Sequence, residues 1–195
     1  MSAINKISKK MGFIYTETNG LHELNEDVSK KTLYGFCRLV VLNYEIGYLE
    51  NNIFISTIKN RIIIKPRCMN ITEETSKIHG ITNEIANDQG ADIEETLITF
   101  LQNLKDVSII ISHNILFHLR TIQAECIRYN IQHNFKKNII IDTSNFYHNI
   151  QYPKLKDLYE TIYNKKPKKK LNLELIKLCF LKLYNDYEVS IISKN

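Results

Sequence analysis

Three of the side chains that could bind a divalent metal ion, those of Glu17, His118 and Asp142, lie far apart in the sequence. Glu17 follows a short apolar segment, His118 lies in a helix-like segment, and Asp142 follows a run of isoleucines. Magnesium prefers oxygen ligands, and imidazole suits transition metals better. The three residues together therefore offer little negative charge for divalent cations. We expect no metal cofactor, and Mg²⁺ or Mn²⁺ at these residues only if the protein is an active enzyme.

Each of the three residues also has a structural explanation that needs no metal. An aspartate such as Asp142, directly before a helical segment, commonly accepts hydrogen bonds from backbone N–H groups at the helix start, and we favour that role for it. Glu17 could be a carboxylate at the end of a strand. His118 could be a histidine at the surface or at the edge of the core.

A second kind of chemistry is suggested by five lysines around one proline, at positions 165–170. A charge run of this kind is usually a solvated loop. It could equally be an arm that grips phosphate groups, because cations bound to phosphates supply much of the affinity for nucleic acid. Both interpretations stay open for Lys165, Lys166, Lys168, Lys169 and Lys170.

The elements that must position these side chains follow from hydrophobic periodicity and turn residues. Strands are predicted over residues 11–16, 33–46, 53–65, 108–112 and 139–141. Helices are predicted from Thr72 to near Gly80, from the N-cap Asp92 onward, over residues 115–130, and in two or three segments that end with residues 171–187. Three strands in succession, followed by alternating helices and strands, predict an α/β fold. Its mixed five-stranded sheet combines an antiparallel meander with parallel strands and has helices on both faces.

Composition limits the classes of protein that fit. The 195 residues suffice for one domain, and the formal net charge of +5 moderately favours a polyanionic partner. No apolar run is long enough to span a bilayer, so no membrane partner is expected. The four cysteines are scattered without a CxxC pair. This pattern predicts an intracellular, reducing compartment, the cytoplasm or the nucleus.

Five segments, in order, resemble the motifs of the DnaQ-like (DEDDh) 3′–5′ exonuclease family. They are residues 13–21 (FIYTETNGL), 78–82 (IHGIT), 112–118 (SHNILFH), 141–143 (IDT) and 154–159 (KLKDLY). The resemblance implies a ribonuclease-H-like domain over residues 11–187, between a flexible segment at 1–10 and a tail at 188–195.

In that family, four carboxylates hold two metal ions and a histidine acts as general base. At the matching positions this chain departs from the pattern. Tyr15, His118 and Ile176 stand where the family has aspartates, and Leu171 stands where it has the histidine. Glu17 is the one acid of the four that remains. With three acids lost, the cleft is expected to be less negative and to favour binding of a phosphate without a metal.

These departures lead to the hypothesis of a catalytically deficient exonuclease homologue that binds DNA or RNA, as single strands or 3′ ends. One alternative is an active metal-dependent exonuclease that uses Glu17, His118 and Asp142. Another is a protein-interaction subunit without affinity for nucleic acid. A protein partner or a homodimer remains open. Besides the lysines, the residues expected to contact nucleic acid are Thr16, Thr18, His79 and Asn114, although Asn114 is mainly expected to shape a turn.

Overall fold

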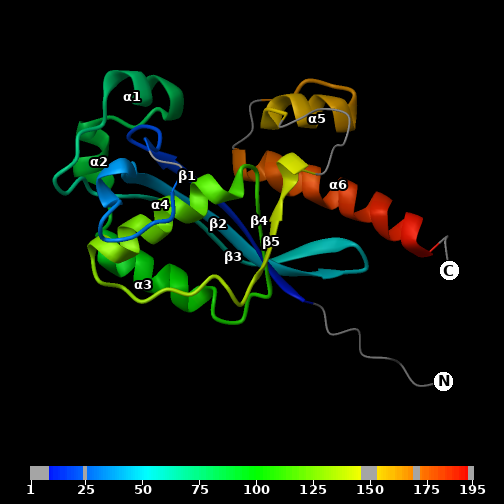
Figure 1. Cartoon of the computed structure of the whole chain (residues 1–195). Coiled ribbons are helices and arrows are strands. Elements are labelled where there is room, and N and C mark those ends of the chain that lie inside the picture. The colour runs from blue at the N-terminus through cyan, green and yellow to red at the C-terminus, as the bar shows by residue number, and fades with distance from the viewer. Residues whose placement is uncertain (1–8, 24–25, 146–152, 169–171, 193–195) are drawn as a thin grey trace.

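The computed structural model describes residues 9–23, 26–145, 153–168 and 172–192. Its strands form one sheet in the order β3-β2-β1-β4-β5 (Figure 1). They are β1 (Lys10–Thr18), β2 (Leu39–Glu50), β3 (Ile53–Ile63), β4 (Ile109–Ser112) and β5 (Ile139–Asp142). The first three are antiparallel neighbours, whereas β4 runs parallel to β1 and β5 runs parallel to β4. The predicted sheet, an antiparallel meander extended by parallel strands, is confirmed.

Helices cover both faces of this sheet, as expected (Figure 1). They are α1 (Glu73–His79), α2 (Asn83–Gln89), α3 (Ile93–Asn103), α4 (Ile115–Arg128), α5 (Leu155–Tyr163) and α6 (Asn172–Ile192). Successive side chains of a strand point to opposite faces. Ile14 of β1 therefore joins the apolar core under α3 and α4, while Phe13 joins the smaller core under α6.

The caps predicted for two helices are present. The side chain of Thr72 accepts a hydrogen bond from the backbone N–H of Thr75 at the start of α1, and Gly80 ends that helix in the left-handed conformation. The carboxylate of Asp92 accepts from the N–H groups of Glu94 and Glu95 at the start of α3. Local sequence therefore sets where these helices begin and end.

The prediction of a strand over residues 33–46 is wrong at its beginning. Residues Leu33–Gly35 form a short 3-10 helix, and β2 starts only at Leu39. The guanidinium of Arg128 in α4 donates to the carbonyl oxygens of Leu33 and Phe36 at 2.8 and 2.6 Å. These two carbonyl oxygens therefore accept hydrogen bonds from a side chain of α4 rather than from the backbone of a neighbouring strand.

A buried ion pair holds α6 against the sheet. Lys177 Nζ lies 3.0 Å from both carboxylate oxygens of Glu45, a buried residue of β2. Glu174 of α6 lies 3.5 Å from the same ammonium group and 3.8 Å from Lys59 of β3. Because a buried charge is costly without its partner, this contact favours one rotational setting of α6 on the sheet.

Candidate functional site

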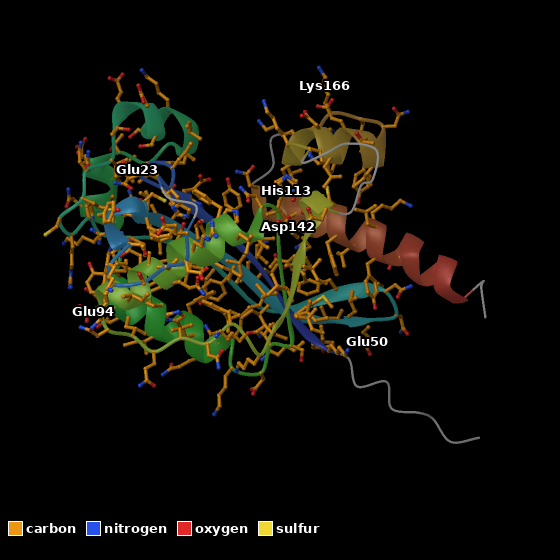
Figure 2. The ribbon with its side chains drawn as sticks, viewed as in Figure 1. Glu23, Glu50, Glu94, His113, Asp142 and Lys166 are labelled. Carbon is orange, nitrogen blue, oxygen red and sulfur yellow. The ribbon has the colours of Figure 1, made fainter. Side chains whose placement is uncertain are left out.

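A pocket of about 340 Å³ opens where β1 ends, between α1 and the first turns of α4, α5 and α6. Its wall brings together residues from five separate stretches of the chain. They are Tyr15, Thr16, Glu17, Thr18, Gly20, Leu21, Thr75, Ile78, His79, His113, Asn114, Phe117, His118, Leu155 and Asn172. Figure 2 shows the neighbouring ends of β4 and β5, marked by His113 and Asp142, under α5.

Tyr15 of β1 is one of the residues that line this pocket. Its ring packs against the ring of His118 at a tilt of 50°, with centroids 4.7 Å apart. Its phenol oxygen accepts a hydrogen bond of 2.8 Å from the side-chain amide of Asn172. Burial, reinforced by the nearby charge of Glu17, raises the pKa of the Tyr15 phenol above its usual range. The phenol is therefore neutral at physiological pH and supplies no negative charge to a cation.

His118 is buried, and both of its ring nitrogens are engaged within the protein. The backbone N–H of Thr16 lies 3.1 Å from Nδ1, and a backbone N–H can only donate. Nε2 lies 3.1 Å from the carbonyl oxygen of His113, which can only accept. These contacts assign the neutral tautomer with its proton on Nε2. Burial lowers the pKa of His118 to about 4, in agreement with that assignment. No nitrogen lone pair remains for a metal ion.

Glu17 carries the one carboxyl group among the described residues that line the pocket. Burial raises its pKa to about 7, against the opposing effect of the positive charge of Arg61. Within the described part of the chain, its side chain makes no hydrogen bond or ion pair. A carboxyl group with this pKa exists in both protonation states near neutral pH.

Asp142 is not among the residues that line the pocket, and its carboxylate binds backbone and hydroxyl donors. Oδ1 accepts hydrogen bonds from the N–H of Asn114 and from the N–H and hydroxyl of Ser144, at 2.8 to 2.9 Å. Oδ2 accepts from the N–H of Ile115 at 3.0 Å. Asp142 thus caps α4 from the neighbouring strand, consistent with the structural role favoured from the sequence.

The four non-lysine residues expected to contact nucleic acid all line the pocket. The hydroxyl of Thr16 is engaged with His118 at 2.8 Å, and that of Thr18 donates to the carbonyl of Gly20 at 2.6 Å. His79 Nδ1 accepts from the N–H of Ile81, while its buried Nε2 has no hydrogen-bond partner within normal geometry. Burial lowers the pKa of His79, so the ring is neutral near pH 7.

Ile176 does not line the pocket, whereas Asn172 does. Ile176 is fully buried in the apolar core with Phe13 and Phe180, one helical turn beyond Asn172. Asn172 instead contacts Tyr15 directly. Ile176, which the resemblance matches to a metal-binding aspartate, thus lies one helical turn away from the pocket wall. Leu171 lies outside the described residues.

The lysine run begins at the far end of α5 from the pocket. Leu155, the first residue of α5, lines the pocket, and Lys165 follows the last turn of that helix about 13 Å away. Figure 2 shows Lys166 beyond α5, on the side away from His113. Lys165, Lys166 and Lys168 are exposed, while Lys169 and Lys170 lie outside the described residues. Among the described residues that line the pocket there is no lysine or arginine, so the cations expected to hold a phosphate lie outside this described lining.

Two exposed apolar side chains at the pocket were not identified from the sequence. Leu21 and Ile78 are each 81% exposed, and both line the opening. The sequence contained no distinguishing signal, since an isolated leucine or isoleucine is more often a core residue. Asn172 lies one helical turn before Ile176, and placing the last motif of the family one turn earlier in the sequence would have identified it.

The donor groups of this site do not fit a two-metal centre. Tyr15 is a neutral phenol, His118 has no free nitrogen, and Asp142 is saturated by four donors. No cluster of three or more His, Cys, Asp or Glu side chains among the described residues is arranged to hold a metal ion. In the same part of the chain, no helix has the length and apolar character needed to cross a membrane.

A family model of exonucleases, RNase_T, matches residues 13–169, which is more than half of the chain. The chain therefore belongs to this exonuclease family, and the resemblance to DnaQ-like exonucleases of the ribonuclease-H-like superfamily is confirmed. No curated protein sequence matches the chain.

Several solved structures share the fold at low sequence identity. E. coli exonuclease I in complex with a 5cy-dA13 oligonucleotide matches with a TM-score of 0.64 and 15% identity, over 90% of this chain and 40% of that one. Product-bound exonuclease I matches with a TM-score of 0.56 and 14% identity, over 71% and 30%. The SSB/exonuclease I structure with the inhibitor CFAM gives 0.56 and 15%, over 71% and 29%. The chain thus spans 29% to 40% of the length of these three structures.

Proposed function

We propose that this protein binds ends of single-stranded nucleic acid at the pocket beside Glu17 and does not hydrolyse them efficiently. The observation that carries the proposal is the set of donor groups on the described lining of the pocket, in which Glu17 is the one carboxyl group. Two-metal hydrolysis needs several acidic ligands around two ions. Tyr15, His118 and Asn172 supply neutral groups instead.

The character of the pocket supports a nucleobase as its occupant. Leu21 and Ile78 offer apolar surface at the opening, and Asn114 and Asn172 offer amide groups. An aromatic base has apolar faces and a hydrogen-bonding edge, which matches such a lining. Phosphates would be held outside the pocket by cations, among which Lys165, Lys166 and Lys168 are candidates. The oligonucleotide bound to E. coli exonuclease I is a precedent for this class of ligand on this fold.

Fluorescence anisotropy with short labelled single strands of DNA and RNA tests binding. In EDTA, we expect measurable affinity that weakens as salt is added. Replacement of both Leu21 and Ile78 by Ala should weaken binding about tenfold, equivalent to about 1.4 kcal/mol. Leu116→Ala is the matched control, because Leu116 is a 58% exposed apolar residue that does not line the pocket. Equal affinity of both variants would contradict a base in the pocket.

Hydrolysis is tested with the same strands in Mg²⁺ or Mn²⁺, resolved on a denaturing gel. We expect no shortening of the strand above the level of a buffer control. Shortening that requires metal and is abolished by Glu17→Ala would instead support an active enzyme with unusual ligands. Glu50→Ala is the control, since Glu50 is an exposed glutamate at the β2–β3 turn (Figure 2).

A protein-interaction subunit is the second candidate, and the sheet edge favours it. β5 is an outer strand of the sheet, and its Ile139 is 52% exposed. Exposed apolar edge strands favour pairing with another chain. Ile139→Lys should disrupt such a complex without altering affinity for nucleic acid. Light scattering on the purified protein would detect a homodimer, and a monomer with high nucleic-acid affinity would favour the first proposal.

A further inference from the structure

A row of polar side chains runs from the pocket across three strands of the sheet. Tyr15 of β1 pairs with Asn43 of β2, and Asn43 pairs with Arg61 of β3. Residues directly opposite one another on antiparallel strands share a face of the sheet. Lys59, two residues before Arg61, contacts Glu174 of α6. Because side chains alternate along a strand, Arg61 also lies on the α6 face.

This row lies between two covered parts of that face. On one side, Val41 and Ile63 pack in the apolar cluster that includes residues of α2. On the other side, Glu45 is held by Lys177 of α6. Asn43 lies between them and is 8% exposed, and within the described part of the chain its side-chain amide makes no hydrogen bond. The row is therefore a polar strip that starts at the pocket and ends at the exposed strand β3.

Arg61 carries a positive charge and forms no ion pair with an acid among the described residues. Arg67, by contrast, is paired with Asp92 and Glu94. Lys59 has Glu45 and Glu174 within 3.8 Å. Arg61 is exposed, and its charge acts on two groups in the pocket: it opposes the effect of burial that raises the pKa of Glu17, and it adds to the effect of burial that lowers the pKa of His79. The guanidinium group is thus electrostatically coupled to the pocket while free to bind a ligand.

We propose that Arg61 binds a phosphate group of a single strand whose terminal nucleotide occupies the pocket. The strand would leave the pocket over Asn43 toward β3, a path two strand spacings, or about 10 Å, long between Cα positions. Guanidinium groups bind phosphate oxygens in pairs, which gives Arg61 both affinity and geometry. This inference rests on the proposed nucleic-acid binding and specifies how the same site holds its ligand.

The test compares Arg61→Gln with Lys59→Gln by anisotropy over a series of salt concentrations, using single-stranded DNA and RNA. Both variants lose one positive charge from the same face of β3, so long-range electrostatics are matched. Loss of one phosphate contact should reduce the slope of log affinity against log salt by about 0.7 and weaken binding about tenfold. Lys59→Gln should leave the slope unchanged, and Arg61→Lys should retain it.

The outcomes separate this inference from the proposed function. If the wild-type protein binds single strands and Arg61→Gln has the wild-type slope, the phosphate contact is refuted while nucleic-acid binding stands. If the wild-type protein binds neither DNA nor RNA, both are refuted. Equal melting temperatures of the three variants would confirm that a lost slope reflects a lost contact. A slope reduced for RNA alone or DNA alone would identify which strand follows this path.

Discussion

Glu17→Gln should make the free energy of unfolding fall more steeply on acidification from pH 7 to pH 5 than it does in the wild-type protein. The reason is that Glu17 and His118 have pKa values shifted in opposite directions within one pocket. Their contributions to stability oppose each other over this pH range in the wild-type protein. When Glu17 is replaced, the loss of stability caused by His118 on acidification is no longer offset.

For Glu17, folding raises the pKa from 4.5 to about 7. A raised carboxyl pKa means that the folded state binds the proton more tightly, so its stabilising effect is present at low pH and lost as the pH rises through 7. Between pH 7 and pH 5, linkage gives a gain of about 2 kcal/mol. Because Glu17 is partly exposed, solvent screening reduces this to about 1 kcal/mol.

For His118, folding lowers the pKa from 6.5 to about 4. The unfolded chain therefore binds a proton that the folded state excludes, and stability is lost as the pH falls below 6.5. Between pH 7 and pH 5, the loss is about 2 kcal/mol by the same relation. This contribution is not discounted, because His118 is buried.

The assay is urea denaturation at pH 7 and pH 5. On acidification, Glu17→Gln should lose about 1 kcal/mol more than the wild-type protein, and the Glu50→Gln control should behave like wild type. His118→Asn should shift the balance in the opposite direction. The other histidines contribute equally to wild type and Glu17→Gln, so they cancel in the comparison. If Glu17→Gln and wild type lose the same free energy, the carboxyl titrates normally and the analysis of the pocket is refuted.

Three further predictions concern the site. Ile176→Asp removes a fully buried side chain, at a cost of about 2–5 kcal/mol, and should lower the melting temperature by about 10 °C. Asn172→Asp should stay within about 3 °C in the same scan, and equal shifts would contradict the placement of the two residues. The triple variant Tyr15→Asp, His118→Asp and Asn172→Asp adds three acids beside Glu17. Calorimetry should detect Mn²⁺ binding by this variant and none by the wild-type protein. No gain would argue against position 172 as the place of a fourth acid beside Glu17 and positions 15 and 118. Asp142→Ala removes four hydrogen bonds and should destabilise the protein by about 2–4 kcal/mol in urea, whereas a loss below about 1 kcal/mol would count against its capping role.

Much of the fold was predictable because its signals are local. Alternation and β-branched residues marked the strands, and Thr72, Gly80 and Asp92 marked helix ends by their own hydrogen bonds. The order of the elements then restricted the topology to a mixed sheet. The beginning of β2 was missed because the guanidinium that holds Leu33 belongs to Arg128, distant in sequence.

The sequence alone determined that a tyrosine and a histidine stand at positions 15 and 118, where the resemblance to DnaQ-like exonucleases implies aspartates, since those positions follow from motifs that lie within single segments. Only the tertiary structure decided which residue of α6 reaches the pocket, because the rotation of a helix depends on packing along its whole length. It placed Asn172 beside Tyr15 and Ile176 in the core. The register of three strands likewise placed Arg61 in one row with the pocket residue Tyr15. Cross-strand register depends on pairing between distant segments rather than on local pattern.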